Sequence, residues 1–383
     1  MTYDFAIPRT RAGEFHRRIE AELDSALKPV LFGSYEDGLQ TVRNAERAFA
    51  VAVGREYSVG THSGTAGLFL ALKACGVGLG HEVITVANSD ISTTAAISHT
   101  GADFVLCDVN SDDHTMSPVD IEPLITDRTR AILPVDLYGH PVDATRIREI
   151  ANEYSLFVVE DAALALGAYE CGEPVGGFAD AVVFSLSPVK PMGSVGSAGM
   201  VATDNPGIFE SLRLLSGYGK SEYVAPQVPG QYAHVVEGYN LTLDPLHAAV
   251  TLVKLDYLQQ HTKARRRVAS QYADALESMN FKGVALPRFR KVSEPTFRSY
   301  TVLVDGRDQV YQRMRDRGVE VCQYYVPPVH LQPVYSSGVQ VGNLKHTEAL
   351  AERLLCLPVD PLMEEQHVEY AAKVLRDTIL SCR

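Results

Sequence analysis

Apolar strands alternate with amphipathic helices along most of this chain. The pattern predicts strands at 57–59, 82–86, 103–107, 131–135, 156–159 and 199–203, and helices at 65–75, 92–99, 144–153 and 208–215. Near-continuous apolar runs such as Phe157-Val158-Val159 are typical of strands that are buried on both faces. The alternation therefore predicts an α/β fold, with a mostly parallel sheet covered by helices on both faces. Ligands in such sheets bind beyond the carboxyl ends of the strands.

The sequence also predicts elements outside this core alternation. Phe15, Ile19, Leu23 and Leu27 recur every four residues, which predicts a helix over 14–27 that Pro29 ends. Further helices are predicted at 43–53, 118–125, 245–279, 309–317, 345–355 and 365–379, and further strands at 300–304 and 320–322. We expect a large domain at 1–250, with an N-terminal arm at about 1–30, and a smaller C-terminal α/β domain at 251–383.

Charge and hydropathy argue against some classes of partner. The 383 residues carry a formal net charge of −12, which argues against a nucleic-acid groove or an anionic membrane as the main partner. The basic cluster at 263–267 indicates a solvent-facing side of a helix, with nucleic-acid contact as the alternative. The chain has no apolar run of about 18 residues and no apolar signal segment after Met1, so we expect a cytoplasmic protein that does not span a membrane.

The six cysteines indicate neither a metal site nor a disulfide framework. They are scattered, without a Cys-x-x-Cys pair and without a nearby histidine at zinc spacing. We expect reduced thiols and no bound metal.

One lysine stands in an unusual context. Lys190 follows an apolar strand and lies in a loop of Gly, Ser, Pro, Val and Met, with no carboxylate beside it in the sequence. A desolvated lysine of this kind is a candidate for a Schiff base with a carbonyl cofactor. A solvated loop charge is the alternative.

A pyridine cofactor held by a lysine needs a carboxylate against its ring nitrogen and a cradle for its phosphate. Asp161 ends an apolar strand, where it can be aimed into a cleft, although an acid there also caps turns. Ser63-Gly64-Thr65 opens a predicted helix, whose free N–H groups favour an anion, although Ser and Thr cap many helices. Ser185, before Lys190, offers a further hydroxyl.

The order of these features, with other stretches, resembles a known family. The chain resembles the DegT-type sugar aminotransferases, which are fold-type I pyridoxal phosphate (PLP) enzymes, over nearly its whole length. The stretches that carry the resemblance are Ser63-Gly64-Thr65, Gly80-His81-Glu82-Val83-Ile84-Thr85, Val135-Asp136-Leu137-Tyr138-Gly139, Val159-Glu160-Asp161-Ala162-Ala163, Phe184-Ser185 with Lys190, Gly238-Tyr239-Asn240, Pro328-Val329-His330 and Leu357-Pro358.

The resemblance implies a role for several residues. Lys190 is similar to the lysine that holds PLP as a Schiff base and then moves a proton between the substrate and the cofactor. Asp161 is similar to the partner of the pyridine nitrogen. Ser63, Gly64, Thr65 and Ser185 are expected around the phosphate. Asn240 is similar to the asparagine lent to the neighbouring subunit, which implies a homodimer with shared active sites.

Three positions depart from the family pattern. Leu164 stands where a Gln or His near the 3′-oxygen of the cofactor is common, and Ile91 stands where an aromatic ring usually stacks on the pyridine. Thr242 replaces the arginine of the common Asn-x-Arg, which is often associated with the dimer-side wall of the site, so the resemblance does not supply that arginine for a carboxylate donor. We still expect Ile91 and Leu164 beside the cofactor.

Candidate substrate contacts are Asp90, Tyr138 and His330. Asp90 and Asp136 are acids where the family more often has neutral residues or histidine. Each is either a paired or solvated structural acid or a group that contacts hydroxyls or amines of the substrate. His330 either faces the site or packs between domains.

The expected activity is amino transfer to the keto group of a sugar, nucleotide sugar, cyclitol or related small molecule, with an amino acid as donor. Leu164, Ile91 and Thr242 leave open a second reaction class, in which PLP supports a lyase or other carbon-bond reaction on an amino acid. A third class is a sensor that binds the cofactor without catalysis, but no effector module is visible in the sequence.

Overall fold

The computed structural model describes residues 5–220, 233–279, 283–336 and 339–381. Within these residues, eight strands form the main sheet in the order β1-β9-β8-β5-β4-β2-β3-β13. Their bounds are β1 Tyr57–Thr61, β2 Glu82–Val86, β3 Asp103–Cys107, β4 Thr129–Ile132, β5 Phe157–Asp161, β8 Ala181–Ser185, β9 Gly199–Thr203 and β13 Gln340–Val341. Strand β9 runs in the opposite direction to the other seven strands of this sheet. The predicted mostly parallel α/β sheet is confirmed.

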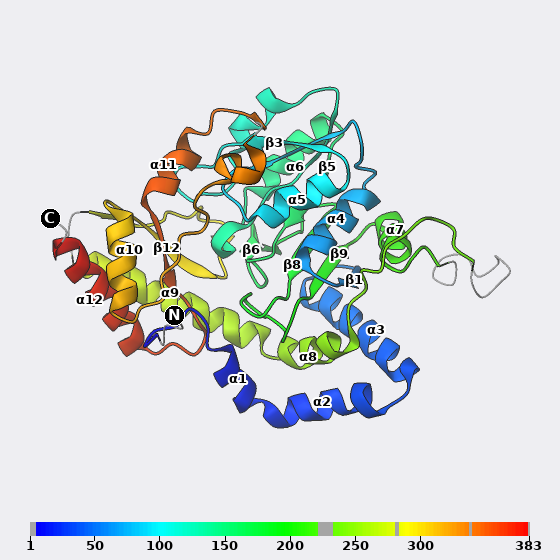
Figure 1. The fold of residues 1–383 in the computed structure, drawn as a ribbon, viewed down its shortest axis with the longest axis horizontal. Coiled ribbons are helices and arrows are strands. Elements are labelled where there is room, and N and C mark those ends of the chain that lie inside the picture. Colours follow the sequence, from blue (N-terminus) through cyan, green and yellow to red (C-terminus); the bar gives the residue numbers. More distant parts are fainter. Residues whose placement is uncertain (1–4, 221–232, 280–282, 337–338, 382–383) are drawn as a thin grey trace.

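Helices cover both faces of this sheet, which makes three layers (Figure 1). The helices are α3 Tyr35–Ala52, α4 Gly64–Ala74, α5 Ile91–His99, α6 Ala144–Glu153, α7 Pro206–Ser216 and α8 Pro245–Leu255. Side chains alternate along β8: Val182 packs in a cluster with Phe49 of α3, and Val183 packs in a different cluster with Leu68 of α4. The sheet is therefore buried on both faces, as its apolar strands predict.

A second, antiparallel sheet belongs to the C-terminal part of the chain. Strand β12 (Ser299–Val304) lies between β10 (Val284–Ala285) and β14 (Leu354–Pro358). The helices of this part are α9 Leu258–Ser278, α10 Arg307–Asp316, α11 Lys345–Arg353 and α12 Glu365–Ser381. Side chains of α9, α10, α12 and this sheet form a core of their own. A small sheet of β6 (Tyr169–Glu170), β7 (Glu173–Pro174) and β11 (Ser293–Glu294) also brings this part against the main sheet's loops.

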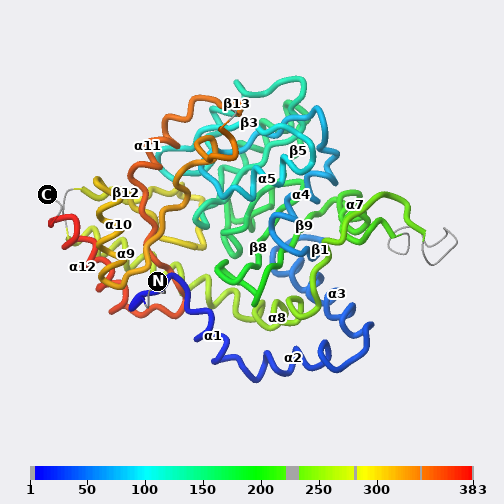
Figure 2. Tube along the Cα trace, in the orientation of Figure 1, coloured from blue at the N-terminus to red at the C-terminus, as the bar shows by residue number. Residues whose placement is uncertain are grey.

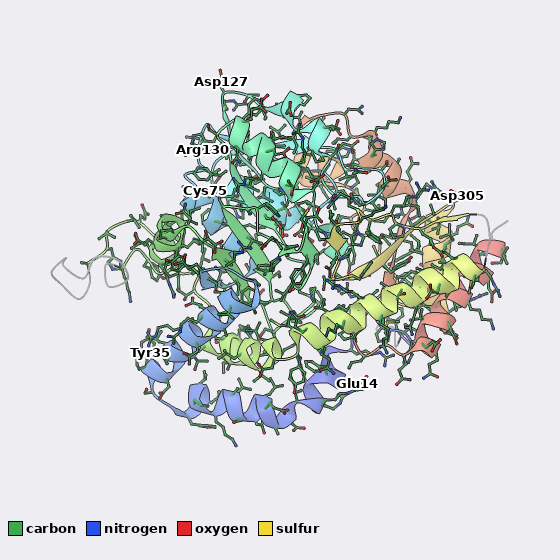
Figure 3. All side chains as sticks on the ribbon, turned by 180° about the vertical axis from the view of Figure 1, so that it is seen from behind. Glu14, Tyr35, Cys75, Asp127, Arg130 and Asp305 are labelled. Carbon is green, nitrogen blue, oxygen red and sulfur yellow. The ribbon has the colours of Figure 1, made fainter. Side chains whose placement is uncertain are left out.

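Three crossings complicate the predicted boundary near residue 250. Ile7, from the N-terminal arm, is buried in the C-terminal core and forms a bridge with Val319. Strand β13 leaves the C-terminal part and pairs in parallel with β3 of the main sheet (Figure 2). Seen from behind, the long helix α9 continues from α8 and crosses from one part to the other (Figure 3). The division at residue 250 stays a prediction.

Several predicted boundaries were wrong for identifiable reasons. Pro29 does not end its helix: α2 (Glu20–Phe32) runs through it, and Gly33 ends the helix by donating its N–H to the Pro29 carbonyl. A proline removes only its own N–H, so the residues after it can still donate. The expected helix 14–27 is also split, because α1 (Ala12–Arg18) ends before α2 begins.

Other errors lie in the second half of the chain. The stretch 245–279 breaks between α8 and α9, and 118–125 forms two 3-10 turns, η1 Pro118–Asp120 and η2 Glu122–Leu124. The apolar end of the expected helix 345–355 belongs to β14, because a short apolar run fits either element. Residues 320–322 make only an isolated bridge, at Cys322. No helix within the described ranges is both long enough and apolar enough to span a bilayer.

Candidate active site

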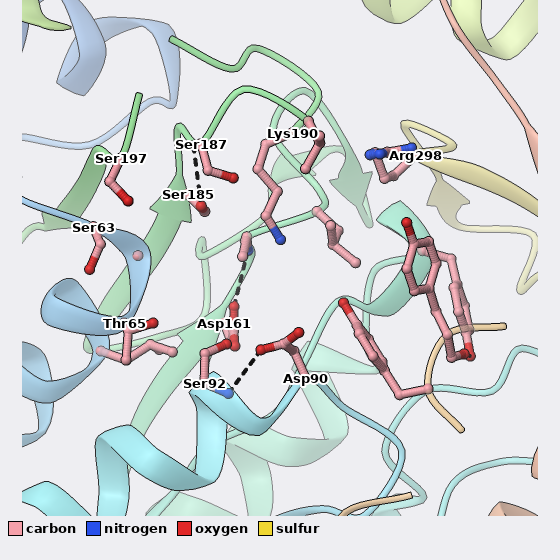
Figure 4. Close-up of a pocket in the computed structure, with 18 of the residues that line it drawn as sticks. Ser63, Thr65, Asp90, Ser92, Asp161, Ser185, Ser187, Lys190, Ser197 and Arg298 are labelled. Atoms are coloured by element: carbon pink, nitrogen blue, oxygen red, sulfur yellow. Dashed lines mark hydrogen bonds between the residues drawn. The ribbon is translucent and has the colours of Figure 1, made fainter. Parts of the chain in front are cut away.

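A cavity of about 350 Å³ opens at the carboxyl ends of β5 and β8, beside the first turns of α4 and α5 (Figure 4). This is the edge of the sheet where ligands are expected. Predicted site residues that line it are Ser63, Gly64, Thr65, Asp90, Tyr138, Asp161, Leu164, Ser185 and Lys190. Because these residues come from five separate stretches of the chain, the fold itself brings them together.

The residues of the predicted phosphate cradle lie at the first turn of α4 and line the cavity. The Ser63 hydroxyl caps the helix by accepting a hydrogen bond from the Ala66 N–H at 3.0 Å. A Cβ atom on Gly64 would lie 2.9 Å from the Ser185 Cβ, so only glycine lets the helix start so close to β8. The remaining N–H groups of the turn and the helix dipole favour an anion. The Ser63 cap therefore leaves the turn suited to an anion, so the capping alternative does not exclude the predicted cradle.

Asp161 is the last residue of β5 and is 4% exposed. One carboxylate oxygen accepts from the Thr93 hydroxyl at 2.9 Å and the other from the Ala163 N–H at 3.1 Å. Burial raises the pKa of this carboxyl, while the hydrogen bonds from Ala163 and Thr93, and the charge of Lys190, lower it. Two donors thus fix the orientation of the carboxyl, which faces the cavity. Asp161 therefore both caps the turn at Ala163 and points into the cleft, so the two alternatives given by the sequence are compatible.

Lys190 extends into the same cavity (Figure 4). Its backbone N–H donates to the Ser187 carbonyl, but no hydrogen bond or ion pair of its amine is found among the described residues. Burial lowers the pKa of the amine, Asp161 raises it and Arg298 lowers it again. A partly buried amine with a lowered pKa is a better nucleophile than a solvated loop lysine, so the structure favours the Schiff-base interpretation.

Asp136 is structural. It is fully buried, does not line the cavity, and one carboxylate oxygen accepts from the Val142 N–H at 2.9 Å. Burial and the neighbouring Glu160 raise its pKa well above the ordinary value for aspartate. Its backbone N–H donates to the Asp161 carbonyl at 3.0 Å. The structural alternative is therefore the one that the structure supports, and the backbone hydrogen bond of Asp136 supports the strand end that carries Asp161.

Two candidate substrate residues have hydrogen-bond partners within the protein. The Tyr138 hydroxyl donates to the Tyr324 carbonyl at 2.6 Å and accepts from the Asn88 amide at 3.0 Å, which leaves no hydroxyl proton for a substrate. Asp90 caps α5 with one oxygen, which accepts from the Ser92 N–H at 2.9 Å. Its other oxygen has no partner among the described residues, so Asp90 can still accept from a ligand in the cavity.

Three predicted site residues do not line this cavity. Ile91 opens α5 and is 42% exposed, although its neighbours on both sides face the cavity. His330 lies in a separate surface hollow, with its Nε2 atom 3.3 Å from Glu348. Asn240 is exposed and forms a backbone bridge with Gly217. Within this chain the structure does not bring them to Lys190.

Sequence reasoning missed several residues that line the cavity. These are Arg9, Ser92, Ser187, Ser197, Arg298, Tyr324 and Tyr325, besides small and apolar residues. Arg298 carried a usable signal, because a charge directly before the apolar strand of β12 is unusual unless it is paired or functional. Arg9 carried none, since nothing in the sequence indicates that the N-terminal arm reaches the main sheet.

Comparison with known proteins identifies the family. The model of the DegT/DnrJ/EryC1/StrS aminotransferase family matches residues 18–376. The chain belongs to this family. The protein is a PLP-dependent aminotransferase with the α/β fold of that family, as its sequence motifs imply.

Relatives of the aminotransferase match along nearly the whole chain. The dTDP-3-amino-3,4,6-trideoxy-alpha-D-glucose transaminase of Streptomyces venezuelae is 35% identical over 91% of this chain and 90% of its own. The UDP-N-acetyl-3-dehydro-alpha-D-glucosamine 3-aminotransferase of Acidithiobacillus ferrooxidans is 33% identical over 99% of this chain and 100% of its own. The structure of S. venezuelae DesV in complex with a ketimine intermediate superposes with a TM-score of 0.89, at 32% identity over 97% of this chain and 98% of that one.

The cavity of the aminotransferase fits PLP. The first turn of α4 offers a site suited to an anion. A Cβ on Gly199 would lie 2.6 Å from the Ser63 carbonyl carbon, so β9 packs tightly against this turn. Asp161 would hold the protonated ring nitrogen, and Lys190 would hold the aldehyde carbon. When bound, PLP supplies an electron sink for the α-carbon of an amino acid. Leu164 lines the cavity but offers no hydrogen bond to a cofactor oxygen.

Proposed function

We propose that this aminotransferase converts a keto group of a nucleotide-activated sugar to an amine, with an α-amino acid as amino donor. The observation that carries the proposal is the Lys190 amine, which has no partner among the described residues and faces the same cavity as Asp161 and the α4 turn. The names of relatives that align along almost the whole chain, two of them 3-amino-sugar transaminases, support a nucleotide sugar as the keto substrate.

Each group in the cavity would have a defined task. Lys190, released from the cofactor, would take the proton from the α-carbon of the amino acid and return a proton at the former aldehyde carbon of the cofactor. Its lowered pKa leaves a larger fraction neutral and able to accept that proton. Asp161, as a carboxylate, would keep the ring nitrogen protonated. The free N–H groups of α4, with Thr65 and Ser185, would hold the phosphate.

The polar wall around Asp90 suits a sugar. The free oxygen of Asp90 accepts hydrogen bonds, and the neighbouring Ser92 offers a hydroxyl that both donates and accepts. A polyhydroxy ring presents many donors and acceptors and gains from such a wall, whereas an apolar ketone would leave it unsatisfied. This wall favours a sugar over an apolar carbonyl compound.

Assembly and location stay predictions. Asn240 is exposed on this chain, as a residue lent to a neighbouring subunit must be, which supports a homodimer with shared active sites. Cytoplasmic location and the absence of nucleic-acid and membrane partners follow from the charge and composition of the sequence alone. The placement of Ile91 beside the cofactor and of His330 beside the substrate are also predictions that require a ligand-bound dimer to test.

Product analysis tests the proposal. The protein, reconstituted with PLP, is incubated with L-glutamate or L-glutamine and with 3-keto sugars linked to dTDP or UDP. We expect an amino sugar nucleotide together with the matching 2-oxo acid. Formation of ammonia, a cleaved carbon chain or an alkene in place of these products would support the lyase alternative and contradict the proposal.

A further inference from the structure

The cavity contains one cation that the assigned roles do not use. Arg298 lines the cavity, yet it is only 4% exposed. Its guanidinium makes no hydrogen bond and no ion pair with any residue that the structure describes. A buried guanidinium without a carboxylate or carbonyl partner carries a large desolvation cost, so such groups are nearly always paired. The arrangement indicates that the partner of Arg298 is a ligand.

The other arginine of the cavity behaves differently. Arg9 already has an ion pair, with its Nε atom 3.2 Å from Glu320, and its Nη1 atom donates to the Tyr324 hydroxyl. Arg9 therefore has its charge compensated within the chain, whereas Arg298 does not. Of the arginines that line this cavity in the described structure, Arg298 is the one left for an incoming anion.

The backbone holds Arg298 in place. Its N–H donates to the Tyr138 carbonyl at 2.8 Å, and the Thr296 N–H donates to the Gly139 carbonyl at 2.9 Å. Phe297, between them, has φ of 53°, a conformation that non-glycine residues seldom adopt. Tertiary contacts thus fix the turn that carries Arg298, so its side chain enters the cavity from a fixed backbone position.

The position of Arg298 selects the kind of anion. In Figure 4, Ser63 and Thr65 lie on one side of Lys190 and Arg298 lies on the other, so Arg298 is not part of the phosphate cradle. Arg298 lowers the pKa of the Lys190 amine, which places its charge within electrostatic range of the reacting nitrogen. An α-amino acid carries its carboxylate on the same carbon as its amine. A nucleotide sugar carries its phosphates several bonds away from a keto carbon on the ring.

We propose that Arg298 binds the α-carboxylate of the amino donor. This inference rests on the proposed transamination and names the group that recognises its donor. The planar guanidinium matches a carboxylate with two parallel hydrogen bonds. Arg298 would supply a carboxylate site from a different part of the chain than position 242, where Thr242 stands in place of an arginine. In the second half of the reaction the carboxylate has left, and the same guanidinium can donate to hydroxyl oxygens of the sugar.

Binding of an unreactive analogue tests Arg298 without turnover. 2-Methyl-L-glutamate lacks the α-proton, so it binds to the holoenzyme and shifts the absorption of the cofactor without completing the reaction. We compare the wild type with Arg298→Gln, Arg298→Lys and Arg307→Gln. Arg307 is the matched control, because it is equally buried but bonded to Asp308 and the Leu354 carbonyl, away from the cavity.

The expected result is a rise of about 10–100-fold in the half-saturating concentration for Arg298→Gln, the range for a lost charged hydrogen bond. Arg298→Lys keeps the charge and loses the paired geometry, so its rise should be smaller. Arg307→Gln should match the wild type. 4-Aminobutyrate, an amine without an α-carboxylate, should bind the wild type and Arg298→Gln equally. The thermal midpoint and cofactor absorption of each variant establish that it is folded and loaded.

Two outcomes separate failure of this inference from failure of the proposed function. If the wild type converts L-glutamate, L-glutamine or L-alanine to a 2-oxo acid but Arg298→Gln and Arg298→Lys bind 2-methyl-L-glutamate as tightly as the wild type, the inference alone is overturned. An equal loss of affinity for 4-aminobutyrate in Arg298→Gln overturns it as well. If the wild type converts none of these amino acids, the proposed transamination is overturned, and the assignment of Arg298 with it.

Discussion

Lys190 and Asp161 face one cavity with opposite charges but form no salt bridge with each other in the described structure. Each still shifts the pKa of the other: Asp161 raises that of Lys190, and Lys190 lowers that of Asp161. A direct ion pair would neutralise both groups and close the cavity. Their separation keeps the amine available for a carbonyl carbon and the carboxylate available for a ring nitrogen, at opposite ends of one cofactor.

Lys190→Ala should abolish the visible absorption of the lysine-bound cofactor. Without the amine there is neither a covalent link nor a base, and loss of a general base alone costs about 10²–10⁴-fold in rate. Lys345→Ala, on the exposed start of α11, is the control and should keep both absorption and rate. Persistence of the same band in Lys190→Ala would show that another lysine holds the cofactor.

Thr93→Val should raise the pKa of Asp161. The Thr93 hydroxyl donates to the carboxylate and lowers its pKa, so removing it favours the protonated acid. A charged hydrogen bond of about 1.5–3 kcal/mol corresponds to about 1–2 pH units. Asp161 must be ionised to hold the ring proton, and activity falls as pH falls through its pKa. The acid limb of kcat/KM should therefore move to higher pH.

The control for Thr93→Val is Thr94→Val, on the same helix. The Thr94 hydroxyl donates to the Ile91 carbonyl and does not contact Asp161. An unchanged acid limb in Thr93→Val, or an equal movement in Thr94→Val, would contradict the role given to this hydrogen bond.

Asp136→Asn should stabilise the protein at alkaline pH. Burial raises the pKa of Asp136 well above its unfolded value, so the folded state favours the protonated form. Stability from this group is fully present below the unfolded pKa and is lost as pH rises through the folded pKa. Asparagine is neutral at every pH and can still accept from the Val142 N–H. The gain in Tm over the wild type should thus grow from acid to alkaline pH.

Thermal unfolding measured at a series of pH values between about pH 5 and pH 9 checks this. Asp127→Asn serves as the control, since Asp127 is exposed on the surface (Figure 3). A gain in Tm that is the same at all pH values, or larger at acid pH, would contradict a buried, protonated Asp136.

Gly199→Ala should weaken cofactor binding more than it weakens the fold. A Cβ there would lie 2.6 Å from the Ser63 backbone, so the first turn of α4 must move. Overpacking of about 1–3 kcal/mol corresponds to a rise of about 5–150-fold in the Kd for PLP, measured by titration of the apoprotein. Gly13→Ala has nothing within 4 Å of the added atom and is the control. An unchanged Kd in Gly199→Ala would argue against the α4 turn as the phosphate site.

The residues at the centre of the candidate site were easier to predict from the sequence than the residues that line its walls. Ser63, Asp161 and Lys190 were predictable because each is attached to a local signal: a helix start, a strand end and a glycine-rich loop. The sequence predicted Ile91 beside the cofactor. In the structure its two neighbours, Asp90 and Ser92, line the cavity but Ile91 does not, because chain position does not give the direction of a side chain at a helix start. Arg9 belongs to a segment that reaches the site only through tertiary packing.

Helices and strands were likewise predictable where a local pattern marks them, and not where long-range pairing decides them. The parallel strands and the helices between them were predictable from periodicity, and strand β2 was predicted to the residue. The break between α8 and α9 has no Gly or Pro to mark it, so the pattern read as one helix. Strand β14 exists because β12 pairs with it, a contact about fifty residues away in sequence that no local window contains.

The half-reaction with an amino donor is the sharpest test of amino transfer at Lys190. The holoenzyme is mixed with L-glutamate alone, and both the cofactor absorption and the chemical form of the released cofactor are followed. We expect loss of the visible band, pyridoxamine phosphate as the cofactor product and one 2-oxoglutarate for each active site. A 3-keto sugar nucleotide should then restore the band. An unchanged band with every common amino acid, or products of elimination with the cofactor still in its aldehyde form, would contradict amino transfer at Lys190.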